Sequence, residues 1–170
     1  MEKFILSVLV ENKFGVLARV AGLFSARGFN IDSLAVSITE DATMSRIIMV
    51  VHADEKLLEQ IKKQLNKLID VIRVDDLTQK DCIDRELVLI KVKINSKIRE
   101  KVVQAVDSLG AKVVAMGNES LTIEESGDSN KINAALELLR PFGILEIVRT
   151  GKIAIRVEKN KEEAKKEGEE

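Results

Sequence analysis

Residues 12–31 read NKFGVLARVAGLFSARGFNI and directly follow an apolar run, FILSVLV, at residues 4–10. The run predicts a strand, and apolar positions spaced by three and four within the longer stretch predict an amphipathic helix. Gly15 then lies between strand and helix, and Gly28 suits the left-handed position just past a helix end. Such a loop exposes the first N–H groups of the helix, where the helix dipole favours an anion such as an amino acid's carboxylate. Spacing alone leaves a second interpretation open, a purely structural turn.

Outward from this stretch, the chain reads as two units of the same plan. In the first unit we expect strands at 3–10, 30–39, 44–53 and 69–77, and helices at 15–27 and 54–68. In the second we expect strands at 86–94, 111–116, 119–125 and 144–157, and helices at 97–109 and 129–140. Each unit is βαββαβ, so the predicted fold class is α+β with two ferredoxin-like units. The predicted domains are residues 1–77 and 85–157, joined by a linker at 78–84 and followed by a charged tail at 158–170.

The strands of the first unit differ in character. Right-handed crossovers place the first and third strands at the sheet centre, and Phe4–Val10 and Ile47–Val51 are the most continuously apolar. Because both of their faces are apolar, we expect the second domain or a partner protein to cover the helix-free face. The edge strand at 30–39 carries no Lys, Arg or Pro, and one face shows Ile31, Ser33, Ala35 and Ser37. An unguarded edge predicts pairing with a second copy of the chain, with Asn30 at the dimer interface.

Composition excludes several classes of function. The 170 residues carry a net charge of −1, which removes the bulk electrostatic case for nucleic-acid or anionic-membrane binding. The sequence has no apolar run of membrane-spanning length and does not open on a secretory signal, so we expect a cytoplasmic protein. Cys82 is the only cysteine, which excludes an internal disulfide.

The reactive side chains do not form a recognisable catalytic pattern. His52 is the single histidine, so we expect no metal site, and no base is marked for Cys82. The carboxylates fall on helix faces and in the tail, which indicates solvated charge rather than acid–base work. An RNA-binding sheet would need aromatic residues on both central strands, but Ile47–Val51 has no aromatic residue to match Phe4. An acyl-phosphate hydrolase would need an arginine in the first loop, where residues 11–17 offer only Lys13. We therefore expect no catalytic residue, no metal and no cofactor on this chain.

Three stretches carry a resemblance to a known family. Residues 7–12, 15–25 and 27–34, SVLVEN, GVLARVAGLFS and RGFNIDSL, are similar to an ACT domain and, more narrowly, to the small regulatory subunits of acetolactate synthase. The resemblance continues through LNKLIDVIRV at 65–74, DREL at 84–87 and VRTG at 148–151, and covers roughly residues 3–157.

The resemblance implies a function. Such a subunit has no catalytic site of its own and binds a large catalytic subunit that uses thiamine diphosphate, a divalent metal (Mg²⁺) and FAD. It raises the partner's activity and makes it sensitive to feedback inhibition by valine, in the biosynthesis of branched-chain amino acids. Valine is expected between two ACT domains of a homodimer. The implied ligand-binding residues are Asn12, Gly15, Val16 and Leu17 of one chain with Asn30 and Ile31 of the other.

Two other functions remain open. One is a free-standing ACT-type amino-acid sensor that acts on a transcription or transport partner. The other, ranked third, is a small phosphohydrolase.

Overall fold

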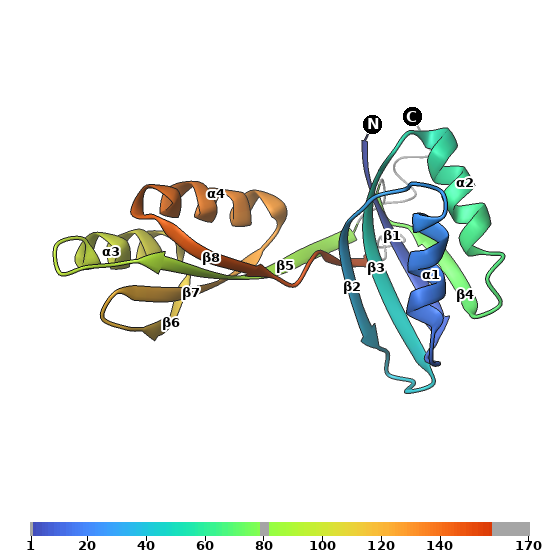
Figure 1. Cartoon of the computed structure of the whole chain (residues 1–170), viewed down its shortest axis with the longest axis horizontal. Helices are drawn as coiled ribbons and strands as arrows, with labels where there is room; N and C mark the ends of the chain where they lie inside the picture. The colour runs from blue at the N-terminus through green and yellow to red at the C-terminus, as the bar shows by residue number, and fades with distance from the viewer. Residues whose placement is uncertain (1, 79–81, 158–170) are drawn as a thin grey trace, which may run out of the picture. The chain divides into compact units, whose positions relative to one another are not determined.

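The computed structural model describes residues 2–78 and 82–157 of the chain, which group into two compact units. The first unit contains β1 (Glu2–Glu11), α1 (Val16–Ser25), β2 (Ile31–Ile38), β3 (Met44–Ala53), α2 (Glu55–Leu65) and β4 (Val71–Asp76). Its sheet is antiparallel with strand order β2-β3-β1-β4, and both helices lie on one face (Figure 1). The expected central strands are therefore at the centre, and the predicted α+β, ferredoxin-like fold is confirmed.

The second unit repeats the plan. It contains most of β5 (Cys82–Lys93), followed by α3 (Arg99–Leu109), β6 (Lys112–Met116), β7 (Ser120–Gly127), α4 (Ser129–Leu139), the 3-10 turn η1 (Arg140–Phe142) and β8 (Ile144–Arg149). The strand order is β6-β7-β5-β8, again with the first and third strands of the unit at the centre. Pro141 follows the end of α4, as expected for a residue that cannot continue a helix.

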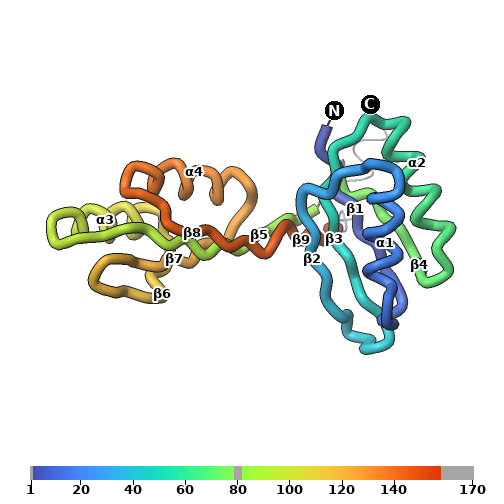
Figure 2. The backbone as a smooth tube through the Cα atoms, in the orientation of Figure 1, coloured from blue at the N-terminus to red at the C-terminus, as the bar shows by residue number. Residues whose placement is uncertain are grey.

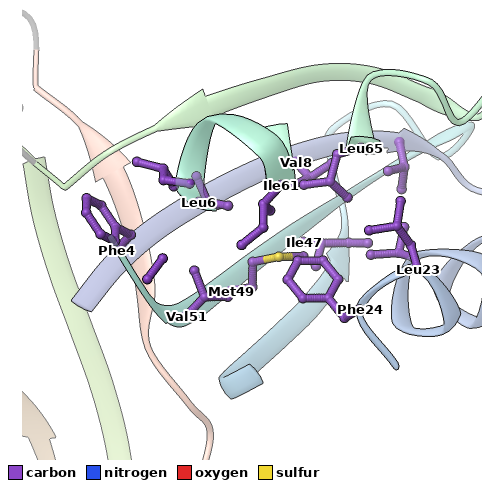
Figure 3. Packing of buried hydrophobic residues seen from close by; sticks show 14 of the residues in the cluster. Phe4, Leu6, Val8, Leu23, Phe24, Ile47, Met49, Val51, Ile61 and Leu65 are labelled. Atoms are coloured by element: carbon purple, nitrogen blue, oxygen red, sulfur yellow. The ribbon is translucent and has the colours of Figure 1, made fainter. Parts of the chain in front are cut away.

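The core of the first unit lies between its sheet and its two helices. Alternate residues of β1 and β3, among them Leu6, Met49 and Val51, are fully buried against Phe24 of α1 and Ile61 of α2 (Figure 3). Helix α2 begins at a side-chain cap: Asp54 accepts a hydrogen bond from the amide of Leu57 at 2.8 Å. Burial of one stripe on each helix holds the scaffold from which the loops project.

The chain between 82 and 157 differs from expectation at both ends. Strand β5 begins at Cys82, so residues 82–84, expected in a linker, are already extended; residues 79–81 and the tail at 158–170 lie outside the described part. The expected last strand at 144–157 is two strands, β8 and β9 (Ile153–Arg156). We expected a second domain as far as 157, whereas residues 152–157 group with the first unit.

This return of the chain covers part of the helix-free face of the first sheet. The backbone amide of Lys152 donates to the Ser33 hydroxyl of β2 at 2.9 Å, and the Arg156 side chain reaches Asp75 of β4. Ile48 and Val50, which face away from the helices, are 5% and 6% exposed. We expected a separate domain or a partner at this face, and the chain's own β9 segment supplies part of the cover.

A bulge at Asp32 corrects one detail of the edge strand. Ile31 pairs with Val51 but Ser33 pairs with Val50, so one extra residue is inserted between them. Ile31 therefore packs against the core on the helix side, whereas Ser33 faces the helix-free side. The two were expected on one face because simple alternation cannot reveal a bulge.

Over the described residues, no helix is both long and apolar enough to cross a membrane.

Candidate functional site

The start of α1 is an uncapped helix end. Gly15 precedes the helix in the left-handed conformation, with φ +81°, and has no side chain that could cap it. Hydrogen bonding begins with the amide of Val16 to the carbonyl of Lys13 at 3.3 Å and that of Arg19 to the carbonyl of Gly15 at 3.0 Å. Within the described residues, the amides of Leu17 and Ala18 have no acceptor. The loop therefore offers two unsatisfied donors at the positive end of a helix dipole, as the sequence predicted.

Asn12 lies beside this loop in a fixed orientation. Its backbone amide donates to the carbonyl of Thr43 at 2.7 Å, and its side-chain Nδ2 donates to the carbonyl of Ala42 at 2.9 Å. Because the amide nitrogen is already engaged, the Asn12 Oδ1 is the atom left to accept a hydrogen bond from a ligand. An exposed asparagine held in this way can receive an ammonium group.

Asn30 is held in the same manner at the start of β2. Its Nδ2 donates to Asp32 Oδ1 at 2.9 Å, and Asp32 Oδ2 in turn lies 2.7 Å from Nδ1 of His52. The Asn30 Oδ1 is again the remaining acceptor. Through Asp32, His52 is thus part of the support of a predicted site residue.

The apolar members of the predicted site have different surroundings. Val16 is 3% exposed and belongs to the core, while Ile31 is half-buried at the core's margin. Leu17, in the first turn of the helix, is 42% exposed, and Phe14 in the loop is fully exposed. Of the predicted site residues, the exposed Leu17 and the half-buried Ile31 have apolar surface left for a ligand or a second chain.

One chain does not bring the predicted residues together. Figure 2 traces β1, α1 and β2 in alternating directions, so that residues 12–15 and residues 28–30 lie at opposite ends of α1. A helix of ten residues spans about 15 Å. Asn12, Gly15, Val16 and Leu17 therefore form one cluster, and Asn30 and Ile31 form another.

Arg19 is a neighbour of the loop that the sequence analysis missed. Its Nη1 would lie 3.1 Å from a Cβ built on Gly15, and its Nε and Nη2 each contact Asp70 Oδ2 at 2.8 Å. The side chain places positive charge beside the two free amides. Its spacing of four residues from Gly15, one helical turn, is the signal that could have identified it.

Two further charged side chains near the loop have hydrogen-bond partners. Lys13 donates to Glu11 at 2.7 Å, and this hydrogen bond raises the pKa of Lys13 above its usual value. In the turn beyond β2, the hydroxyl and amide of Thr43 both donate to Asp41 Oδ1, which lowers the pKa of Asp41. Both groups therefore stay charged near neutral pH and frame the loop without entering a catalytic arrangement.

Comparison with known proteins covers nearly the whole chain. The family described as AHAS small subunit-like ACT domain matches residues 6–73, and the family described as small subunit of acetolactate synthase matches residues 85–158. The acetolactate synthase small subunit of Mycobacterium leprae is 53% identical over 150 residues, 88% of this chain and 89% of that protein. The probable acetolactate synthase small subunit of Archaeoglobus fulgidus is 47% identical over 153 residues, 90% of this chain and 96% of that protein.

A solved structure agrees with this assignment. The acetolactate synthase small subunit of Thermotoga maritima superposes with a TM-score of 0.86 at 34% identity, covering 94% of this chain and all of that one. Family match, sequence identity and fold therefore lead to one conclusion: the chain belongs to the acetolactate synthase small subunit family, with an ACT domain in its first half.

Proposed function

We propose that this chain activates the large catalytic subunit of acetolactate synthase and makes it sensitive to inhibition by valine. The observation that carries the valine part is the uncapped start of α1, where the amides of Leu17 and Ala18 lie free beside Asn12. Helix α2 has an aspartate cap at the equivalent position, and α4 is capped by Asp128. The free amides of an uncapped helix start can bind a carboxylate from outside the chain.

The proposed binding site takes one half from each of two chains. The cluster around Gly15 holds the carboxylate, and the oxygens of Asn12 and of the partner chain's Asn30 accept from the ammonium group. Leu17 and Ile31 contact the isopropyl group. This division agrees with the separation of the two clusters within one chain.

Topology supports a twofold arrangement through β2. Asn12 contacts the turn at Ala42–Thr43, so the Gly15 loop lies at the sheet end where β2 finishes. Antiparallel pairing of two β2 strands puts the first residues of one strand, Asn30 and Ile31, beside the last residues of the other. Three side chains on the helix side of β2 are also exposed and apolar: Leu34 at 37%, Val36 at 44% and Ile38 at 62%. A second copy would bury them.

In this proposal the chain contributes regulation and no chemistry. Thiamine diphosphate, Mg²⁺ and FAD belong to the catalytic subunit. Among the described residues, no group of three or more His, Cys, Asp or Glu side chains is placed to hold a metal ion. A ligand that bridges two chains favours whichever dimer geometry completes the bridge, so valine can shift the population of states presented to the catalytic subunit.

The test is reconstitution with the catalytic subunit. We expect the two proteins to co-purify, synthase activity to rise on mixing, and valine to suppress that rise. Valine at about a hundred times its dissociation constant should also stabilise the isolated chain by roughly 2.7 kcal/mol per site. If the chain instead captures a transcription or transport partner from its source and leaves the synthase unaffected, the alternative of a free-standing sensor holds.

A further inference from the structure

The helix-free face of the first sheet carries a groove rich in arginine. It encloses about 230 Å³ and has Ser7, Arg46, Arg73 and Asp75 of the sheet on one side and Arg156 of β9 on the other. None of the six predicted valine-binding residues lines it. The groove is therefore separate from the site described above.

Its charges do not balance. Asp75 Oδ2 accepts from Arg73 Nε at 2.7 Å, and Asp75 Oδ1 lies 3.8 Å from Arg156 Nη2. Arg46 donates through Nη1 to the Ser7 hydroxyl at 2.9 Å, and over the described chain it has no carboxylate partner. Three guanidinium groups thus share one carboxylate, which leaves the positive charge of the groove uncompensated.

Arg46 and Ser7 occupy positions that an apolar residue would ordinarily fill. Ser7 is 3% exposed and interrupts the apolar run of β1, and Arg46 is half-buried between β1 and β2. A cation withdrawn from water costs free energy unless an anion accompanies it. Because Ser7 supplies only a neutral oxygen, the surroundings of Arg46 favour a negatively charged ligand.

The rest of the groove's lining is apolar, and the groove itself is small. Leu77, Ala154 and Ile155 border the cationic part of the groove. The volume is below the range usual for drug-sized ligands, which indicates a molecule of few atoms. A charged head on the arginines and a short carbon body against Leu77 and Ile155 would match both halves of the lining.

We propose that this groove binds a small organic dianion, a dicarboxylate or a phosphate monoester, whose charged groups lie on Arg46 and Arg156. Such a ligand would join β3 to β9, because the two arginines come from those strands. Strand β9 already pairs with β5, and the Lys152 amide just before it donates to Ser33, so the ligand would add a contact to the first sheet at the far end of β9. Ligand binding should therefore hold residues 153–156 on the sheet.

The experiment is a calorimetric titration of the full chain at constant ionic strength. Succinate represents the dicarboxylates, glycerol 3-phosphate the phosphate monoesters, and succinamide is the uncharged control. We expect saturable binding of at least one dianion, one per chain, and none of succinamide. Arg46→Gln and Arg156→Gln should each weaken binding at least ten-fold, and Arg140→Gln, at an exposed position in the second unit, should not. Hydrogen exchange at 153–156 should slow when the dianion is bound.

Several results would overturn the proposal. One is the absence of saturable binding of both dianions, and another is undiminished binding by Arg156→Gln, a variant at a half-exposed side chain whose loss should not unfold the chain. A third result combines two measurements: neither dianion shows saturable binding, and Arg46→Gln weakens association with the catalytic subunit. The groove would then bind an acidic segment of that protein instead of a small molecule. Valine binding serves as an independent readout. If both arginine variants retain it, the two sites are distinct; if they lose it while folded, the groove is not a separate site.

Discussion

Asp32 fixes the orientation of the Asn30 side chain. Its Oδ1 accepts a hydrogen bond from Asn30 Nδ2 at 2.9 Å, while its Oδ2 lies 2.7 Å from Nδ1 of His52. A flipped amide would set its carbonyl oxygen against the carboxylate, so the Asn30 Oδ1 must point away from Asp32. That oxygen is the atom to which the proposal assigns the ammonium group of valine.

The first prediction follows from this contact. Asp32→Ala frees the amide of Asn30 to rotate, and we expect the dissociation constant of valine to rise about ten-fold, equivalent to about 1.4 kcal/mol. Isothermal titration calorimetry measures the change, with circular dichroism to verify the fold. Asp107→Ala, at an exposed position of α3, is the control. Equal affinity of Asp32→Ala and the unaltered protein would show that Asn30 needs no such support.

Replacing either of two glycines in the α1 region by alanine should change the free energy of unfolding, in opposite directions for the two positions. Gly15 has φ +81° and a Cβ there would meet Arg19 at 3.1 Å, so we expect Gly15→Ala to lower the free energy of unfolding by about 1 kcal/mol. Gly22 is helical with open space around its Cβ position, so Gly22→Ala should raise it by up to about 1 kcal/mol. Urea denaturation compares them. A stabilising Gly15→Ala would contradict the strained loop.

The dimer prediction needs a residue on the helix side of β2. Ser33 is unsuitable because its hydroxyl accepts from Lys152, so its replacement would also disturb β9. Val36→Lys introduces charge where the proposed interface buries apolar surface, and we expect a monomer at micromolar concentration. Ile72→Lys, at a similarly exposed position of the opposite edge strand β4, should leave the dimer intact. Light scattering distinguishes the species, and a monomeric unaltered protein would refute the edge argument.

An ion pair in the second unit gives a stability prediction. Arg149 donates from Nε and Nη2 to Glu86 at 2.7 and 2.5 Å, and this hydrogen bonding raises the pKa of Arg149. Because Glu86 is 7% exposed, Arg149→Met leaves a buried carboxylate unpaired and should cost about 2 kcal/mol.

The control for that prediction is Arg140→Met. Arg140 pairs with Glu137 where both side chains are well exposed, so we expect no measurable loss. The double change Glu86→Gln with Arg149→Met should recover part of the lost stability. Thermal unfolding of all three variants provides the comparison, and equal effects of Arg149→Met and Arg140→Met would contradict it.

Local patterns in the sequence were enough for the elements and the strand order. The alternation in β5 and the spacing of Leu58, Ile61 and Leu65 in α2 directly express which side of each element is buried. The return of β9 to the first unit was not predictable, because Lys152 and Ser33 are 119 residues apart and neither carries a local signal of the contact. The bulge at Asp32 was not predictable either, because simple alternation of residues cannot reveal an inserted residue.

The candidate site, too, could be predicted only in part from the sequence. Gly15 and the free helix start could be predicted, since a glycine loop before an apolar helix has local consequences for the backbone. The orientations of Asn12 and Asn30 could not, because they depend on the carbonyl of Ala42 and on the carboxylate of Asp32. Arg19 was not predicted, because its pairing with Asp70, 51 residues further along the chain, has no local signal.

The central claim is that each valine site is shared between two chains, and mixed dimers test it most directly. Asn12→Ala and Asn30→Ala should each abolish most valine inhibition of the reconstituted synthase while preserving activation. Asn66→Ala, at an exposed position after α2, should preserve both.

When the two defective variants are unfolded together and refolded as a mixture, half of the dimers contain one chain of each kind. In such a dimer one site carries both changes and the other carries neither. About a quarter of all sites are then intact by twofold symmetry, and valine binding and inhibition should partly return. If the mixture stays as insensitive as either variant alone, the site lies within a single chain and the account is wrong.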